Sequence, residues 1–399
     1  MRTRGRWIAF SIGLVLLAAC SKPDAGSKAG AKDEFVFGVI LVGPKNDHGW
    51  SEAHFTAGQY VEKKLPGAKM LCVDNLPSKQ GVTVPQVAAD MIEKGAKVIF
   101  TTSDHFQDGT LEAAKKHPDV HFVNISGDHA WKEGKNFKAP ANYSNLMGRM
   151  EYGKMIMGCA AGLTTKTGKI GYLGPLINDE TRRLAACAYL GARHAWVDIR
   201  KQDPKDLQFK VTWIGFWFHM PGKTLDPVSV AGDFYNTGYD VVLSGIDTTE
   251  ALSEAQKARA NDKTVWAMPY DYRDAGKGAD DVNLGVAYFN WGPSYTKILR
   301  DAKAGKLTQF FEWVGPDWKD LNNPDTSAIG FVKGQALDDE HAKHLDVFTA
   351  KLADGSLNLL KGPLNFQDGT PYLKEGEAAT DLQIWYFPKL LEGMEGKNE

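Results

Sequence analysis

The stretch Phe35-Val36-Phe37-Gly38-Val39-Ile40-Leu41 is followed by a polar, turn-forming segment at 43–49 and then by Trp50. Seven residues with no polar side chain are typical of a strand that is buried on both faces of a sheet. A helical pattern begins at Trp50, and a second short apolar run follows at 70–73. This order of strand, loop, helix and strand predicts a parallel sheet covered by helices.

The same alternation continues along the chain and then begins again. The further apolar runs that we expect to be strands lie at 97–100, 120–123, 169–174, 210–215, 241–244, 265–268 and 283–289. Two successive sets of strands and helices predict an α/β protein with two similar lobes, each a parallel sheet flanked by helices. About 365 residues follow the N-terminal segment, which is enough for two domains.

The residues after each predicted strand are the candidates for function, because ligands of open parallel sheets bind beyond the carboxyl ends of the strands. Aromatic residues and aspartates gather at these positions. The candidate ligand-binding residues are Asp47, Trp50, Asp104, Phe106, Trp217, Phe218, Asp247, Asp271 and Trp291. Aromatic rings stack on flat ligands, and carboxylates accept hydrogen bonds from N–H and hydroxyl groups. The pattern therefore favours a flat ring with polar edges.

These residues also have an ordinary structural explanation. Asp47, Asp247 and Asp271 precede predicted helices, and an aspartate at that position often caps a helix N-terminus. Aromatic residues are most often part of a core. Trp50 and Trp291 stand beside glycines rather than inside apolar runs, which favours a pocket for these two.

Composition argues against several classes of protein. The net charge is −2 and no basic cluster follows the N-terminal segment, so we expect no nucleic-acid binding. No GxSxG, P-loop, HExxH or cysteine–histidine signature occurs, and we expect no catalytic residue, no metal and no cofactor. Three cysteines follow Cys20, namely Cys72, Cys159 and Cys187. They could form one disulfide and leave one free thiol, or all three could be free thiols.

The N-terminal segment has the pattern of an export signal. Three arginines among the first six residues precede an apolar run at 8–17, and small residues then lead to Cys20. The run is too short to span a bilayer, which takes about 20 residues, and the pattern resembles a bacterial lipoprotein signal. We expect 1–20 to be the signal, Cys20 to carry lipid, and 21–34 to be a flexible tether. The alternative is an uncleaved anchor helix.

Motifs along the chain, taken in order, resemble the basic membrane protein family. These proteins are the substrate-binding lipoproteins of ABC importers, of the kind that bind purine nucleosides or bases. The motifs are GVILVGP at 38–44, DHGW at 47–50, TTS at 101–103 with Asp108, KKHPDVHF at 115–122, Thr212-Trp213, Trp217-Phe218, Pro221-Gly222-Lys223, DTT at 247–249, and NWGP at 290–293 followed by Tyr295. The resemblance covers about 35–370.

The resemblance implies a periplasmic-binding-protein type I-like fold, in which two lobes are joined by three crossovers and enclose the ligand. We expect the crossovers near 142–144, at Asn290 and near 308–313. Lobe one then comprises 35–142 plus 291–308, and lobe two comprises 143–290 plus 309–399. The tail from Trp318 to Glu399 is longer than a minimal lobe needs, and we expect part of it to be an elaboration over the surface.

The resemblance also bears on the ligand. Trp50 takes the place of an aromatic residue in the family's nucleoside binders, and Asp271 matches an aspartate that holds the ribose. Those binders carry a lysine near the second crossover, whereas this chain has none between Lys277 and Lys297. The chain resembles instead the subgroup with Trp-Gly-Pro, here at 291–293, for which a free purine base such as adenine is our first choice.

The implied function is that of an extracytoplasmic, lipid-anchored monomer that binds a purine base or nucleoside and delivers it to an ABC permease with its ATPase. Ligand binding would shift a hinge equilibrium toward the closed form. Two alternatives stay open. One is a secreted nucleoside- or sugar-processing enzyme that uses Asp104, Asp271 or His105 as acid or base. The other is a ligand sensor with the same fold.

Overall fold

The structure is a computed structural model that describes residues 34–399. The predicted signal 1–20, with Cys20, and nearly all of the predicted tether 21–34 lie outside the described residues. From Phe35 to Glu399 the chain forms one compact unit. No helix within this described part is both long enough and apolar enough to cross a membrane.

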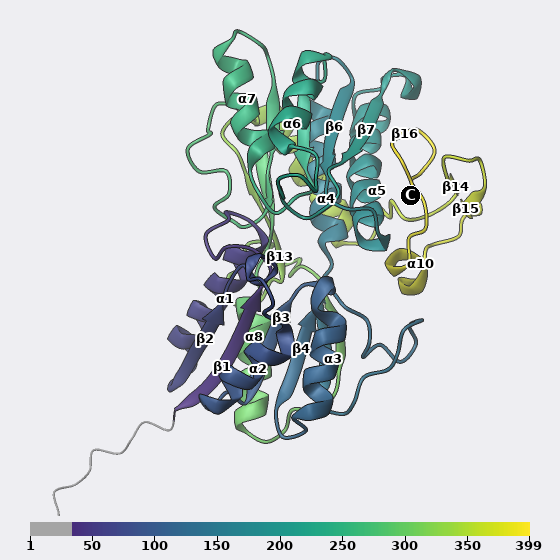
Figure 1. Ribbon diagram of the computed structural model, residues 1–399. Coiled ribbons are helices and arrows are strands. Elements are labelled where there is room, and N and C mark those ends of the chain that lie inside the picture. Colours follow the sequence, from purple (N-terminus) through teal and green to yellow (C-terminus); the bar gives the residue numbers. More distant parts are fainter. Residues whose placement is uncertain (1–33) are drawn as a thin grey trace, which may run out of the picture. The chain divides into compact units, whose positions relative to one another are not determined.

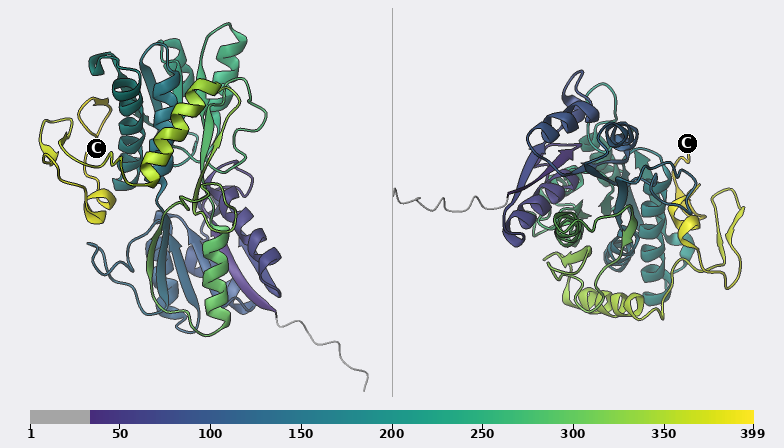
Figure 2. Two further views of the ribbon diagram at one scale, coloured as in Figure 1. Left: turned by 180° about the vertical axis from the view of Figure 1, so that it is seen from behind. Right: turned by 90° about the horizontal axis from the view of Figure 1, so that it is seen from below.

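The first lobe is built on a six-stranded parallel sheet with β1 (Phe35–Leu41) near one edge. From Phe37 onward every residue of β1 is buried, because helices cover both faces of the sheet. Helix α1 packs beside α8 on one face, and α2 packs beside α3 on the other (Figures 1 and 2). The sheet order is β12 (Phe311–Val314), β5 (Tyr143–Gly148), β4 (His121–Ile125), β3 (Val98–Thr102), β1 and β2 (Ala68–Val73). The helices are α1 (Trp50–Lys64), α2 (Val84–Glu93), α3 (Gln107–Lys116) and α8 (Gly292–Lys303).

The second lobe repeats this architecture around a five-stranded parallel sheet. Its order is β16 (Met394–Glu395), β7 (Gln208–Trp213), β6 (Lys169–Gly174), β8 (Val241–Ser244) and β9 (Trp266–Met268). The helices are α4 (Met150–Thr164), α5 (Asp179–Arg193), α6 (Pro227–Asn236) and α7 (Glu250–Ala260). Helices α4 and α5 touch backbone to backbone, since a Cβ on Gly158 would lie 1.8 Å from the carbonyl oxygen of Ala188.

A small third sheet lies on α4 and contains β10 (Tyr270–Asp271), β11 (Gly285–Phe289) and β13 (Ile329–Lys333). The chain passes between the lobes three times: after β5, between β11 and α8, and after β12. The predicted two-lobed α/β fold, with parallel sheets flanked by helices and three crossovers, is therefore confirmed.

Two of the predicted lobe boundaries differ from the structure. Strands β5 and β12 pair in the sheet of lobe one, with Ser144 opposite Val123 and Trp313 opposite Met147. The sequence prediction assigned both strands to lobe two, from 143 and from 309 onward. The reason is that β5 contains buried polar residues, so its sequence lacks the apolar run by which the other strands were recognised.

The C-terminal tail contacts both lobes (Figure 1). Helix α9 (Asp339–Ala353) packs on α4, and β16 joins the sheet of lobe two. Between these elements, Tyr386 stacks on Trp131 of lobe one with ring centroids 5.9 Å apart, and its hydroxyl donates to Asp128 at 2.6 Å. The other elements of the tail are β14 (Leu364–Asn365), β15 (Pro371–Leu373) and α10 (Asp381–Trp385).

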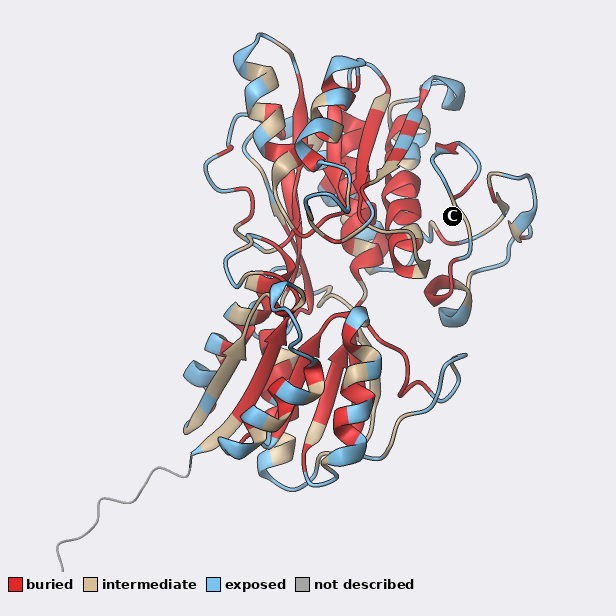
Figure 3. Cartoon of the chain, in the orientation of Figure 1, coloured by how far each residue is buried: buried red, intermediate tan, exposed pale blue. Residues whose placement is uncertain are grey.

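The strands of the two main sheets are largely buried, and the helices that cover them are exposed mainly on their outer sides (Figure 3). Cys159 on α4 and Cys187 on α5 lie in the core, and Cys72 on β2 is half-buried. All three are free thiols, which settles the choice that the sequence left open.

Candidate functional site: a cavity between the two lobes

A cavity lies where the carboxyl ends of the strands of the two lobes face each other. Its unfilled space amounts to about 270 Å³, a volume that includes the open solvent at its mouth. Lobe one contributes Val42, Trp50, Ser103, Asp104 and Ser126, and lobe two contributes Glu180, Trp217, Asp247 and Tyr270.

Trp50 is the first residue of α1, and its indole Nε1 donates to the carbonyl oxygen of Thr102 at 2.7 Å. This bond joins the start of α1 to the end of β3 and fixes the ring on the wall of the cavity. Asp47 holds the same helix end, because its carboxylate accepts 2.9 Å hydrogen bonds from the backbone N–H groups of Gly49, Ser51 and Glu52. Asp47 therefore caps this helix end, which is the structural role that the sequence analysis gave as the alternative to ligand binding.

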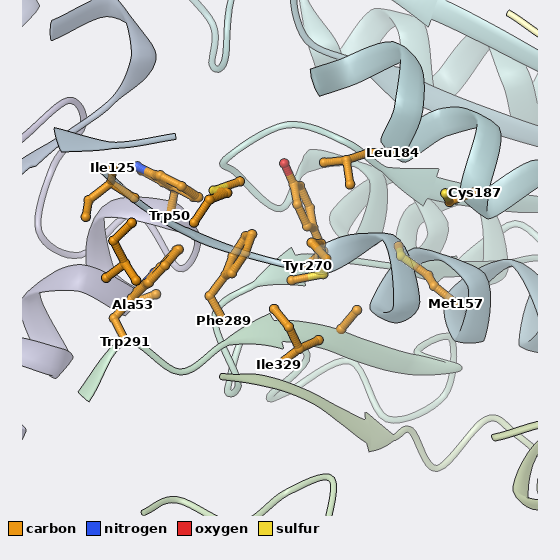
Figure 4. Close-up of a cluster of buried hydrophobic side chains, with 14 of the residues drawn as sticks. Trp50, Ala53, Ile125, Met157, Leu184, Cys187, Tyr270, Phe289, Trp291 and Ile329 are labelled. Atoms are coloured by element: carbon orange, nitrogen blue, oxygen red, sulfur yellow. The ribbon is translucent and has the colours of Figure 1, made fainter. Parts of the chain in front are cut away.

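Trp291 forms a layer behind Trp50 within one cluster of buried side chains (Figure 4). It is not among the residues that line the cavity. It is 2% exposed and stacks between His54 and Phe289, with ring centroids 4.6 and 4.7 Å away. The edge of Trp50 meets this stack, 5.5 Å from the Trp291 ring. The layer keeps Trp50 from rotating away from the cavity.

Trp217 brings a second indole to the cavity, from the loop after β7 in lobe two. Its carbonyl oxygen accepts from the backbone N–H of Asp247 at 2.8 Å, so the loops after β7 and β8 are joined there. The lobes meet at this point: a Cβ on Gly49 would lie 1.8 Å from the carbonyl oxygen of Asp247. Only glycine permits so close an approach between α1 and lobe two.

Three carboxyl groups line the cavity, namely Asp104 from lobe one and Glu180 and Asp247 from lobe two. The Asp104 carboxylate accepts a 2.8 Å hydrogen bond from the backbone N–H of His105. It accepts a second, of 3.2 Å, from the side-chain amide of Asn178 in lobe two. Burial raises the pKa of Asp104 and raises that of Asp247 well above its usual value, with the nearby Asp271 adding to the latter shift. Burial also raises the pKa of Glu180 to about 8.

Asp271 lies outside the wall of the cavity, directly after Tyr270, and is fully buried. Its backbone has φ 75°, and neither carboxyl oxygen has a hydrogen-bond partner among the described residues. Burial raises its pKa well above the usual range, opposed by Lys154. The Lys154 ammonium donates to the Ser244 carbonyl at 2.7 Å and lies 3.2 Å from the centre of the Tyr270 ring. Burial lowers the pKa of Lys154 to about 7.

Of the nine residues predicted from the sequence, the structure brings Trp50, Asp104, Trp217 and Asp247 together around the cavity. Phe106 is buried in lobe one, and Phe218 lines a separate groove that it shares with Asp47. The remaining two predicted residues are Trp291, which lies in the layer behind Trp50, and Asp271, which is buried and interacts electrostatically with Lys154.

Sequence reasoning missed Glu180, Tyr270, Ser103 and Ser126 as wall residues. Glu180 follows β6, and the rule that ligands bind beyond strand ends applies to that strand as well as to the others. The search for aromatic residues and aspartates directly after each strand did not find Glu180. Residues 175–178 separate the end of β6 from the acidic pair at the start of α5.

Comparison with known proteins was made for sequence and for structure. The model of a family described as Bmp, "ABC transporter substrate-binding protein PnrA-like", matches residues 35–306. A purine-binding protein of Brucella abortus is 28% identical over 93% of this chain and 96% of its own length. An ABC transporter nucleoside-binding protein of Lactococcus lactis is 30% identical over 65% of this chain and 70% of its own. A solved solute-binding protein of an ABC transporter from Aeropyrum pernix covers 83% of this chain and 93% of its own, with a TM-score of 0.64 at 11% identity, which shows a shared fold.

Proposed function

Since this chain belongs to the Bmp family of PnrA-like ABC transporter substrate-binding proteins, we propose that it binds a purine base in the cavity between its lobes and delivers it to a permease. Its membership confirms the family that the motifs indicated. An adenine-like base is our first choice of ligand, and a nucleoside is the second.

The observation that carries the proposal is the pair of tryptophans that reach one cavity from opposite lobes. Trp50 and Trp217 are held in place by hydrogen bonds that fix α1 and the loop after β7. Stacking on an aromatic ring contributes about 0.5–1.5 kcal/mol beyond the burial of area. A flat ligand can use both rings only when the lobes are together, so binding favours the closed form.

The carboxyl groups of the cavity support a base. Asp104, Glu180 and Asp247 offer hydrogen-bonding partners for ring N–H and amino groups at the edges of a heterocycle. The purine-binding and nucleoside-binding relatives support the same class of ligand.

Export and anchoring complete the proposal. The sequence around Cys20 has the pattern of a lipoprotein signal, and a lipid there would keep the protein at a membrane, where its permease and ATPase are located. We propose an extracytoplasmic, monomeric binding protein rather than an enzyme. Mass spectrometry of the N-terminal fragment of the mature protein tests the anchor: a diacylated Cys20 is expected, and an unmodified residue would contradict it.

Titration calorimetry with adenine, guanine, hypoxanthine, adenosine and glucose tests the ligand class. Adenine or another free base is expected to bind more tightly than adenosine, and glucose is expected to give no heat of binding. Prior unfolding and refolding removes any ligand that stays bound during purification. Absence of binding by every purine would sink the proposal, and breakdown of adenosine during the titration would favour an enzyme.

A further inference from the structure

Two carboxyl groups of the cavity, those of Asp247 and Glu180, have no hydrogen-bond or ion-pair partner among the described residues, and the sequence did not predict Glu180. It is the second residue of α5, is 8% exposed, and faces the cavity. Among the described residues, no hydrogen bond or ion pair reaches its carboxyl group, whereas Asp104 accepts from His105 and Asn178. The Glu180 carboxyl oxygens are not among the fully enclosed polar atoms of the described residues, so a ligand in the cavity can supply the missing partner.

The nearest cation does not supply that partner. Arg183 lies one turn further along α5, but its Nε donates to Glu151 at 2.6 Å and its Nη1 to the Trp385 carbonyl at 3.3 Å. The charged groups that act on Glu180 are Arg183 on its own helix, Asp104 in lobe one and Glu151 on α4. Asp247 and Asp271 also feel its charge. Arg183 has the largest effect among these charges, and the acidic groups oppose it.

These surroundings decide which form of Glu180 meets a ligand. Burial, together with Asp104 and Glu151, raises its pKa to about 8, against the opposing effect of Arg183. At neutral pH the group is then mainly a carboxylic acid. Such a group offers one O–H donor and one carbonyl acceptor, whereas an ionised carboxylate offers acceptors alone.

We propose that Glu180 is a ligand-binding residue whose carboxyl group meets a ring edge on which an N–H donor lies beside an acceptor. This inference rests on the proposed function and adds to it a residue and a mode of recognition. The amino group of adenine beside a ring nitrogen is such an edge. Asp104, which is already supplied with donors from the protein, faces another part of the ring.

The test compares Glu180→Gln with Glu180→Leu, using adenine as the probe. A glutamine keeps one donor and one acceptor at every pH, whereas a leucine fills similar space with neither. Calorimetry at about pH 7 and about pH 9 measures the dissociation constant of each variant and of the wild type. The wild type is expected to bind about tenfold more weakly at the higher pH, because Glu180 then loses the proton that its bound form requires.

Glu180→Gln is expected to lose this pH dependence, and Glu180→Leu is expected to bind about tenfold or more weakly than Glu180→Gln at the lower pH. If Glu180→Gln keeps the full dependence, the titrating group is another one, such as Asp247, Asp271 or Lys154, and the inference is overturned. Equal affinities of the leucine and glutamine variants overturn it as well. If Glu180→Leu fails to fold, the difference in pH dependence between the wild type and Glu180→Gln is sufficient to support or overturn the inference.

Failure of this inference is distinguishable from failure of the proposed function. A wild-type protein that binds no purine at either pH contradicts the function itself. A wild-type protein that binds adenine equally well at both pH values retains the function and removes this role from Glu180.

Discussion

At the scale of single residues, the site depends on side chains that are held by partners outside the cavity. Trp50 is positioned by a hydrogen bond to Thr102 and by the rings of Trp291 and Phe289, and its ring centroid lies 5.2 Å from that of Phe289. Asp47 fixes the end of the helix from which Trp50 projects. Binding and folding thus share residues, and a useful variant must separate the two.

Trp50→Ala is expected to weaken adenine binding about tenfold or more, since it removes one face of the proposed ring site. Trp318→Ala is a matched control, because Trp318 contacts Tyr152 away from the cavity. Calorimetry of both variants, with melting curves to check folding, gives the answer. Wild-type affinity in a folded Trp50→Ala protein would remove this residue from the site.

The sequence predicted part of this site and not the rest. Residues directly after strands, such as Trp50, Asp104 and Asp247, were found because a parallel sheet brings its strand ends together. Which of them face the cavity was not predictable, because Trp291 and Trp50 look alike in sequence and differ only in packing. Glu180 was missed because it follows its strand after a longer loop.

At the scale of elements, α1 and the loop after β8 meet through backbone atoms. The contact of Gly49 with the Asp247 carbonyl leaves no room for a methyl group, which would lie 1.8 Å from that oxygen. Gly49 has φ −147°, a value open to any residue, so the need for glycine here comes from the approach between lobes and not from backbone conformation.

Gly49→Ala is therefore expected to keep the lobes apart and to weaken adenine binding about tenfold or more, while the melting temperature changes little. Gly232→Ala on α6 is the control, since its nearest neighbour would be 3.8 Å from the added Cβ. Small-angle scattering with adenine would show a Gly49→Ala protein more open than wild type. Unchanged affinity in that variant would contradict the closing role of this contact.

Elements differed in how well the sequence predicted them. Strands such as β1 and β8 were clear because apolar runs of this kind are buried on both faces. Strand β5 was not, since Ser144 and Asn145 are polar yet fully buried. Asn145 is satisfied there by donating to Asn124 and accepting from the backbone of Ala130. Such pairing depends on tertiary neighbours that no local pattern reveals.

At the scale of the whole molecule, the C-terminal tail from Trp318 onward ties the two lobes together. Arg182 of lobe two donates to the Phe387 carbonyl at 2.9 Å, while the adjacent Tyr386 contacts Asp128 and Trp131 of lobe one. The length of the tail was visible in the sequence. Its attachment to both lobes was not, because it rests on scattered aromatic contacts.

Tyr386→Phe tests this attachment. The hydroxyl donates to Asp128 and accepts from the backbone N–H of Lys135 at 2.7 Å, so its loss is expected to lower the free energy of unfolding by about 1–2 kcal/mol. Tyr60→Phe, which removes an exposed hydroxyl bonded to Asp325, is expected to change it by much less. Urea unfolding measures both, and equal losses would contradict the special role of Tyr386.

A crystal structure of the protein with adenine would show directly whether one purine base lies between the two lobes, with Trp50 and Trp217 on its faces. We expect density for a flat ring in this cavity, with ring nitrogens or the amino group within hydrogen-bond distance of Asp104, Glu180 or Asp247. Adenine bound elsewhere on the protein, with this cavity free of it, would contradict the proposed binding mode.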